Sequence, residues 1–362
     1  MITKSIAKAF CIVLIISSIF SMPSLTFGGY TLKDNLIAGH SILKIYDSNN
    51  SGLSGKGVYG VFQDSEGLFW IATIYALHQY DEKRDQWVDF LGYGAESSSY
   101  NIEFMGQSVD KKIWVAGNQT GADDKPNVSS FDGRRWWNDF GPSRSNLKGF
   151  IQAMFPGKDG KLWFAISNKL AAYDGREWSF LKPVAKKVNG IQSGIQDSEG
   201  YIWLGTMQGV FRVDQYKQEW RVYSEVASRF VRSIYEDRKG RIWFADQDDR
   251  IAVYKKDTDA WTYYSLPAYM VRIPRPSEPD FKHTDKLAAI RLGIDAIHED
   301  RAGKILFATP KGLFSFVEKE NKWELFTQQN SNLPSDLITC ITEDDSGRIW
   351  IGTGKGLIVL AP

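Results

Sequence analysis

Residues 344–350 read DDSGRIW, and this frame of Asp, two residues, Gly, two residues and a bulky apolar residue occurs five times in the chain. Asp can bond its own backbone and Gly accepts a positive φ, so the frame predicts a tight hairpin turn. Apolar runs on both sides, as at 338–341 and 349–351, indicate two antiparallel strands. The copies run from Asp64 to Trp70, Asp197 to Trp203, Asp237 to Trp243, Asp300 to Leu306 and Asp344 to Trp350.

The anchor residue at the end of the frame recurs seven times, with steps of 44, 49, 40, 40, 63 and 44 residues. A period near 40 residues is typical of a repeat array. A second tryptophan follows six of the anchors and opens a fourth strand. Four strands in each of seven repeats predict an all-β fold, a seven-bladed β-propeller of four-stranded antiparallel blades. The anchors are Trp70, Trp114, Trp163, Trp203, Trp243, Leu306 and Trp350.

The seventh repeat has a third strand at 356–360 but no fourth strand after it. The missing strand is found near the other end of the chain, because residues 43–53 resemble residues 323–333 at a constant offset of 280. We therefore expect residues 42–47 to form the outer strand of the last blade and to pair with 357–360. This pairing would close the ring and leave no exposed end blade.

Residues 1–28 have the features of a cleaved secretory signal peptide: two lysines, an apolar core at 9–20 and small residues at 26 and 28. The alternative is an uncleaved N-terminal membrane anchor. Residues 29–362 are then a single propeller domain that is secreted or periplasmic, with no transmembrane span. This mature chain has 42 basic and 43 acidic residues, a balance that excludes an electrostatic surface for nucleic acid.

Two segments carry a family resemblance. Residues 234–243 (IYEDRKGRIW) and 341–353 (ITEDDSGRIWIGT) resemble the two-component regulator propeller repeat, and the linker 330–334 is similar to the loop between its blades. In that family the repeats usually form the extracytoplasmic sensor of a histidine kinase that recognises nutrients, often oligosaccharides. The resemblance implies a sensory or interaction module whose partner is an oligosaccharide or a membrane signalling protein. Repeats 2 and 3 depart from the frame at 110–112 and 157–160, so their hairpins are expected to differ.

Catalytic and cofactor motifs are not evident. The four histidines have no metal-ligand spacing, and neither a nucleophile elbow nor a phosphate loop is present. His298 occupies an ordinary strand position in its repeat. The repeated aspartates are interpreted as turn formers, because a catalytic pair would be unique to one or two blades. We therefore expect no cofactor and no metal, and we assign no catalytic residue.

Binding residues are expected where the repeats differ. The 63-residue step reveals an insertion at 265–289, while 117–128 and 246–250 also break the repeat. All three segments connect blades or join second to third strands, so they should share one face around the mouth of the central channel. Loops that vary on a fixed scaffold commonly carry binding residues. The candidates are Asp124, Asp246, Asp248, Asp249, Arg250, Tyr269, Arg272 and His283.

The favoured interpretation is a binding or sensing module rather than an enzyme. One alternative is a secreted polysaccharide lyase or hydrolase that uses acids on the same face, and another is a structural scaffold. An enzyme would bring titratable groups from different blades together with displaced pKa values.

Overall fold

The computed structural model describes most of the chain after the predicted signal peptide, and residues 35–362 form one unit. Residues 1–28 lie outside the described part, so the signal peptide remains a prediction. In the part that is described, no helix is long and apolar enough to span a membrane. The described residues are 36–54, 57–73, 76–91, 100–119, 128–137, 151–166, 169–181, 190–224, 230–273, 286–290 and 293–362.

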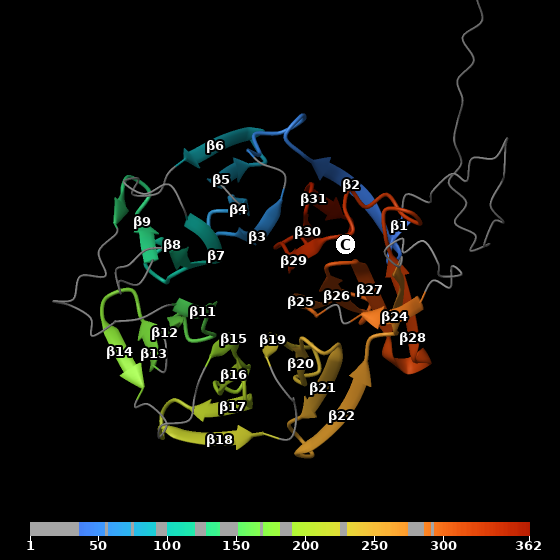
Figure 1. Ribbon diagram of the computed structural model, residues 1–362. Coiled ribbons are helices and arrows are strands. Elements are labelled where there is room, and N and C mark those ends of the chain that lie inside the picture. The colour runs from blue at the N-terminus through green and yellow to red at the C-terminus, as the bar shows by residue number, and fades with distance from the viewer. Residues whose placement is uncertain are drawn as a thin grey trace, which may run out of the picture. The chain divides into compact units, whose positions relative to one another are not determined.

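Seven antiparallel sheets surround a common centre, as the sequence period predicts (Figure 1). In each blade the first strand is innermost and the fourth is outermost. The strands of blades 1 to 4 are β3 (Val58–Gln63), β4 (Phe69–Thr73), β5 (Ala76–Asp81), β6 (Gln86–Leu91), β7 (Tyr100–Gln107), β8 (Ile113–Gln119), β9 (Val128–Phe131), β10 (Trp136–Trp137), β11 (Ile151–Pro156), β12 (Leu162–Ile166), β13 (Lys169–Tyr173), β14 (Trp178–Leu181), β15 (Ile191–Gln196), β16 (Ile202–Thr206), β17 (Gly209–Asp214) and β18 (Glu219–Tyr223).

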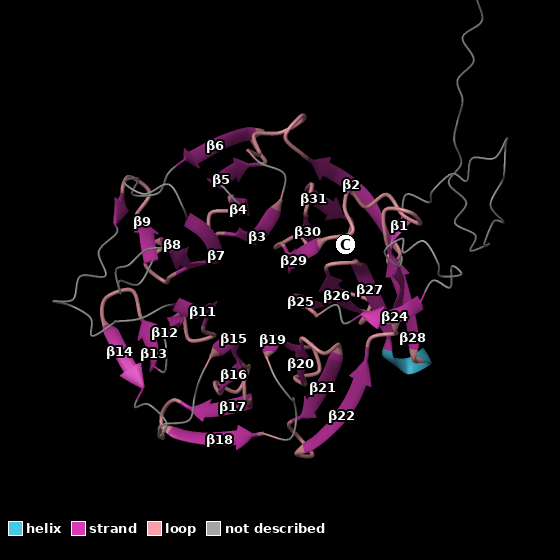
Figure 2. Cartoon of the chain, viewed as in Figure 1, coloured by secondary structure: helices cyan, strands magenta, loops and turns pink. Residues whose placement is uncertain are grey.

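Blades 5 to 7 follow the same order, and a two-stranded ribbon, β23 and β24, lies between blades 5 and 6 in sequence. A single 3-10 turn, Glu318–Glu320, is the only helix among the described residues (Figure 2). The remaining strands are β19 (Val231–Glu236), β20 (Ile242–Asp246), β21 (Arg250–Lys255), β22 (Ala260–Ser265), β23 (Tyr269–Ile273), β24 (Lys286–Ile290), β25 (Ala296–Glu299), β26 (Ile305–Thr309), β27 (Gly312–Val317), β28 (Lys322–Phe326), β29 (Ile338–Glu343), β30 (Ile349–Thr353) and β31 (Gly356–Leu360).

The ring closes through the N-terminal segment, which confirms the strand predicted at 42–47. Strand β2 (His40–Tyr46) pairs antiparallel with β31, with Ile45 opposite Ile358 and Tyr46 opposite Leu357. A short strand not foreseen from the sequence, β1 (Leu36–Ile37), adds to β2, so the last sheet has five strands instead of four.

The repeated frame forms the predicted hairpin turn. In blade 1, Asp64 N donates to Leu68 O (2.8 Å), and Gly67 N donates to Asp64 O (3.0 Å). Gly67 has a φ of +83°, which favours glycine. The expectation that the hairpins of repeats 2 and 3 differ is wrong for the backbone. Ser108 and Gly157 replace the aspartate there, and each still makes the two turn hydrogen bonds.

The turn aspartate has a second role that turn chemistry alone does not predict. Its carboxylate accepts a hydrogen bond from the buried indole of its own repeat, as from Trp203 Nε1 to Asp197 Oδ2 (2.8 Å). The same bond occurs in repeats 1, 5 and 7. In repeat 3, where Gly157 replaces the aspartate, the buried Trp163 Nε1 has no partner among the described residues.

Repeat 6 has Leu306 instead of tryptophan, and an imidazole takes the place of the indole as hydrogen-bond donor. His40 Nε2 from the N-terminal strand lies 2.9 Å from Asp300 Oδ2, and His40 Nδ1 lies 2.8 Å from Ala361 O. The hydrogen bond to Asp300 raises the pKa of His40. Burial of Asp300 is more than offset by its hydrogen bonds from His40 and Lys304, so its pKa is lowered. His40 therefore links the N-terminal strand, blade 6 and the C-terminus.

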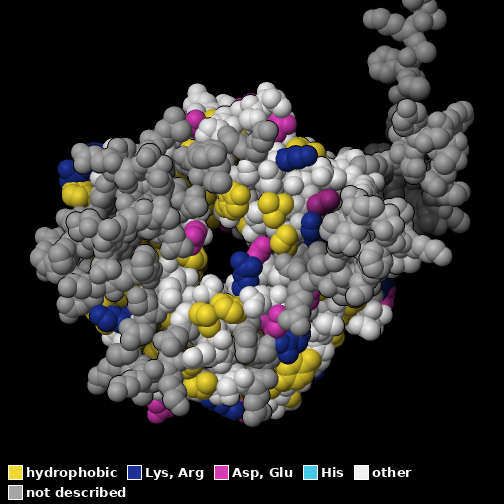
Figure 3. Space-filling model, viewed as in Figure 1, with side chains coloured by type: hydrophobic (Ala, Val, Ile, Leu, Met, Phe, Trp, Pro, Cys, Tyr) yellow, Lys and Arg dark blue, Asp and Glu magenta, His cyan; other side chains and the backbone are white. Residues whose placement is uncertain are grey.

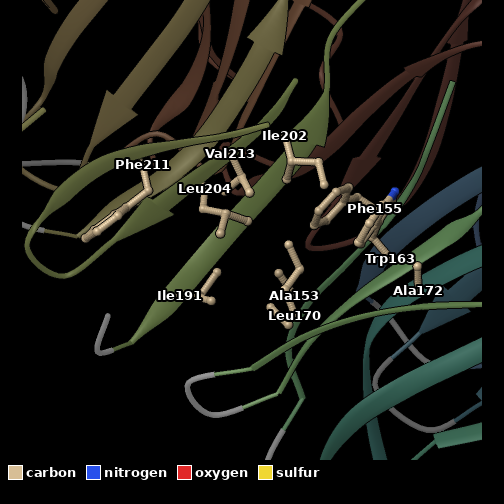
Figure 4. Packing of buried hydrophobic residues seen from close by; sticks show 11 residues of the cluster. Ala153, Phe155, Trp163, Leu170, Ala172, Ile191, Ile202, Leu204, Phe211 and Val213 are labelled. Carbon is tan, nitrogen blue, oxygen red and sulfur yellow. The ribbon is translucent and has the colours of Figure 1, made fainter. Parts of the chain in front are cut away.

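Apolar side chains fill the spaces between adjacent blades. The cluster drawn in Figure 4 joins Phe155 and Trp163 of blade 3 to Ile202, Leu204 and Phe211 of blade 4. The anchor Trp203 is fully buried and packs against blade 5. Because each blade has both faces covered by its neighbours, the hydrophobic core of this fold consists of the apolar layers between the blades.

Polar side chains also join the blades at the Asp-turn end. In most blades the residue before the first turn residue accepts a hydrogen bond from the turn of the preceding blade, as in Ser65 N to Gln107 Oε1 (2.8 Å) and Ser198 N to Glu236 Oε2 (2.9 Å). Gln63 of blade 1 accepts in the same way from Asp345 N of blade 7 (2.9 Å), whereas repeat 3 has Pro156 at this position. We call this end of the ring the turn face and the opposite end, with its variable connections, the loop face.

Candidate functional site

The loop face is the place where the repeat is least regular. Figure 3 shows one face of the ring, with charged and apolar side chains around an opening at its centre. The most complete group of candidate residues in the described part of the chain lies at the junction of blades 5 and 6. It contains four of the eight residues predicted from the sequence, namely Asp246, Asp248, Asp249 and Arg250.

Asp246 closes the turn between β20 and β21. Its Oδ1 accepts hydrogen bonds from Asp248 N (2.8 Å) and Arg250 N (3.1 Å), so it replaces the hydroxyl of Thr206, which serves the corresponding turn of blade 4. Its Oδ2 is buried without a hydrogen-bond partner in the described part, although Arg250 Nε forms an ion pair at 3.3 Å. Burial is the main reason that the pKa of Asp246 is raised.

Asp249 holds both ends of the insertion. Its carbonyl oxygen accepts from Leu266 N (2.9 Å), where the insertion begins, and its Oδ1 accepts from Gly293 N (2.8 Å), just after the insertion ends. Asp249 has a φ of +63°, which aspartate tolerates better than most residues. These two bonds place the turn at 246–250 and both ends of the insertion at the same end of the ring, as expected for a shared face.

A further ion pair lies beside this turn and was not predicted from the sequence. Arg232 Nη1 at the start of β19 is 3.5 Å from Asp295 Oδ1, which follows the insertion. Burial raises the pKa of Asp295, and the charge of Arg232 only partly offsets this effect. Half of each side chain of Arg232 and Arg250 is exposed. The junction thus combines two carboxyls of raised pKa with two accessible guanidinium groups.

The insertion begins and ends as a β-ribbon. Strand β23, which contains Tyr269 and Arg272, pairs with β24, with Tyr269 opposite Ile290 and Arg272 opposite Leu287. Just before this ribbon, Pro267 and Ala268 line a shallow pocket with strands β27 and β28 of blade 6. The base of the insertion therefore lies against the outer half of blade 6.

The remaining candidates are not placed. Asp124 and His283 lie outside the described residues, so their grouping with the others stays a prediction.

His298 is a buried residue of β25, and its Nε2 lies 3.3 Å from Glu343 Oε2 on the turn face. Across the described residues, no three His, Cys, Asp or Glu side chains are grouped as metal ligands.

The fold defines this chain as a seven-bladed β-propeller. Residues 225–248 and 332–355 match the family described as Two component regulator propeller. The chain thus contains repeats of this family, as the sequence resemblance implied. Comparison with curated proteins gives no significant match.

Solved structures with the same fold have diverse descriptions. The extracellular domain of the hybrid two component system BT4673 from B. thetaiotaomicron aligns at 20% identity and a TM-score of 0.64, covering 88% of this chain and 39% of that one. Streptogramin B lyase aligns at 12% identity and a TM-score of 0.62, covering 88% of this chain and 96% of that one. PorZ, a surface component of the type-IX secretion system of Porphyromonas gingivalis, aligns at 17% identity and a TM-score of 0.62, covering 88% of this chain and 48% of that one. This chain spans about two fifths of the BT4673 domain, and at these identities the likeness concerns the fold alone.

Proposed function

We propose that this chain is a secreted or periplasmic binding propeller, a sensory or interaction module that recognises its ligand at the junction of blades 5 and 6. The observation that carries the proposal is the pair of hydrogen bonds by which Asp249 fixes both ends of the insertion. They fix the chain just before and just after the ribbon of β23 and β24, where Arg250 lies opposite Ser265 and Arg232 lies near Gly293. Fixing the two ends of a binding segment lowers the ordering cost of binding, which suits recognition.

The chemistry of the junction fits a neutral polar ligand such as an oligosaccharide. Arg232 and Arg250 supply hydrogen-bond donors, while Asp246 and Asp295 supply carboxyl groups. Sugar hydroxyls both donate and accept, so they can pair with both kinds of group. The likeness to the BT4673 extracellular domain supports a sensory role of this kind. A membrane signalling protein that docks on the same surface is the alternative partner.

One observation favours a second candidate function, a secreted polysaccharide lyase or hydrolase. Asp246 and Asp295 come from neighbouring blades, and burial raises the pKa of both. A carboxyl of raised pKa can act as a general acid. Incubating the protein with polysaccharides and measuring new reducing or unsaturated ends distinguishes an enzyme from a binding module.

A glycan array probed with the mature chain tests the binding proposal. Arg250→Ala should weaken binding about tenfold or more, since a lost hydrogen bond to a charged group is worth about 1.5–3 kcal/mol. Arg84→Ala is the matched control, because Arg84 also pairs with a turn aspartate but lies on the turn face. Deleting 267–286 should abolish binding with little change in melting temperature. Equal binding by all variants, or selective loss in Arg84→Ala, would overturn the proposal.

The compartment is tested separately. Cell fractionation and N-terminal sequencing of the secreted or periplasmic protein should find a mature chain that begins near residue 29. A chain that retains residues 1–28 in the membrane fraction would support the anchored alternative.

A further inference from the structure

Blade 1 carries a polar cross-strand pair where the other blades are mostly apolar. His78 is the third residue of β5 and lies opposite Asp89 of β6. The corresponding pairs are Phe211 with Val222 in blade 4 and Phe314 with Leu325 in blade 6. Blade 7 has Ile358 opposite Ile45 at this position. His78 is fully buried, so its polar ring atoms need partners.

Both ring nitrogens of His78 have such partners. Nδ1 is in a short contact with the carboxylate of Asp89, and Nε2 lies 3.3 Å from both Ser54 Oγ and Thr73 Oγ1. A carboxylate only accepts hydrogen bonds, so Asp89 fixes the proton of a neutral imidazole on Nδ1. Nε2 is then an acceptor, and one of the two hydroxyl groups must donate to it.

The geometry of Thr73 leaves Ser54 as the donor. Thr73 Oγ1 donates to Ala76 O (3.1 Å), and it accepts from Ala76 N (3.2 Å). The donated bond is also made by the threonines of other blades, where Thr206 donates to Gly209 O (2.9 Å) and Thr309 donates to Gly312 O (2.7 Å), so it belongs to the turn. The single hydroxyl proton of Thr73 is thereby used, and Ser54 Oγ–H donates to His78 Nε2.

Ser54 also departs from its repeat. The loops 47–54 and 327–334 have the same internal bonds, in which Ser51 Oγ donates to Asp47 O and Ser331 Oγ donates to Thr327 O. At the last position of this loop Ser54 stands where the other copy has Pro334. Ser54 is half-buried, whereas the imidazole behind it is inaccessible to solvent. A molecule in solvent can therefore reach the hydroxyl of Ser54 on one side of the imidazole ring and the carboxylate of Asp89, which is 35% exposed, on the other.

We propose that Ser54, His78 and Asp89 form a nucleophilic triad that hydrolyses carboxylic esters. Ser54 Oγ bonds to the ester carbonyl carbon while its proton passes to His78 Nε2. The bond to the alkoxide leaving group then breaks, and that group takes the proton from Nε2. Water repeats the two steps, which releases the carboxylic acid and restores Ser54 and neutral His78. Asp89 remains a carboxylate throughout and positions the ring.

The site is independent of the proposed binding site, since it involves blade 1 instead of the junction of blades 5 and 6. Each proposal can therefore fail without the other. The two would also respond to different variants, because none of the triad residues contacts the turn at 246–250 in the described bonds.

A fluorophosphonate probe followed by peptide mapping tests the triad on the mature chain. We expect labelling of Ser54 and a burst of p-nitrophenol from p-nitrophenyl acetate, both absent in Ser54→Ala and unchanged in Ser198→Ala, which alters a serine of the turn face. His78→Phe, which inserts the residue found in blades 4 and 6, should slow acylation ~100-fold or more, as loss of a general base does. Its melting temperature reports whether the blade is intact.

Asp89 is a positioning residue, and two variants separate that role from a structural one. Asp89→Asn should lower the acylation rate at unchanged melting temperature, whereas Asp89→Glu should retain a measurable rate. Labelling of Ser54 no faster than of Ser198, or a rate unaffected by His78→Phe or Asp89→Asn in a folded protein, would overturn the proposal.

Discussion

The hydrogen bond between the anchor indole and the turn aspartate should stabilise the propeller, and the chain contains its own control. Trp203 donates to Asp197 Oδ2 at 2.8 Å, while Trp163 occupies the same place in blade 3 without a partner in the described part. Both indoles are buried between blades. Replacing each by phenylalanine removes the N–H from two nearly equivalent sites that differ in the acceptor.

The expected magnitudes follow from these contacts. The smaller ring leaves a void at either site, which costs about 1–2 kcal/mol. Trp203→Phe also loses a hydrogen bond to a charged group, worth about 1.5–3 kcal/mol. Trp163→Phe instead removes a buried unsatisfied donor, which raises the free energy of unfolding by about 1–3 kcal/mol and offsets the void. Because the void cost is common to both variants, Trp203→Phe should lower the free energy of unfolding by about 2.5–6 kcal/mol more than Trp163→Phe does.

Urea unfolding followed by tryptophan fluorescence and circular dichroism measures this difference, provided that the m-value is unchanged. Lys256 Nζ, 3.7 Å from Asp197 Oδ2, would keep the carboxylate paired in the variant. Equal destabilisation of the two variants, within an experimental error of about 0.5 kcal/mol, would show that the bond from the indole to the aspartate does not stabilise the propeller.

Three further predictions concern closure and the insertion. Leu306→Trp should lower the melting temperature, because His40 already occupies the Asp300 carboxylate; a stabilised variant would reveal spare room in blade 6. The pKa of His40 is raised, so its contribution to the free energy of unfolding is complete below pH 6.5 and is lost as the pH rises through the folded-state pKa. The pKa of Asp300 is lowered, so its contribution is complete above pH 3.8 and is lost as the pH falls through the folded-state pKa. The urea midpoints of wild type and His40→Ala should therefore differ most between pH 3.8 and 6.5, and the difference should shrink as the pH rises further; a constant difference would argue against the ion pair. Asp249→Gly, which accepts the φ of +63°, should speed limited proteolysis within 265–289 with little change in melting temperature, and unchanged cleavage would show that the Asp249 side chain does not fix the insertion.

Much of the fold could be predicted because the same sequence pattern occurs in repeat after repeat. The spacing of the anchors determines the number of blades, and the 280-residue offset reveals the N-terminal strand that pairs with β31. The indole bond was missed, although the constant six-residue separation of Asp and Trp in four repeats was an available signal. The contact of His40 with Asp300 had no comparable signal, because it joins residues 260 positions apart and occurs once.

The candidate site could be predicted only in outline. Broken repeats identified the turn at 246–250 and the insertion, but not that Asp249 would bond to Leu266 and Gly293, since those contacts depend on the path of the chain between blades. His78 and Asp89 were missed for a different reason. Their pairing depends on strand register, and comparing each strand position across the repeats would have revealed two polar residues where other blades have apolar ones.

Hydrogen–deuterium exchange of the mature chain with and without the glycan that binds best in the array tests most directly which face of the ring is the functional one. We expect protection at 246–250 and 286–294, with no change in the turns at 64–67, 237–240 and 344–347. Protection confined to those turns, with 246–250 unaffected, would show that the ligand binds the turn face and that the junction of blades 5 and 6 is not the binding site.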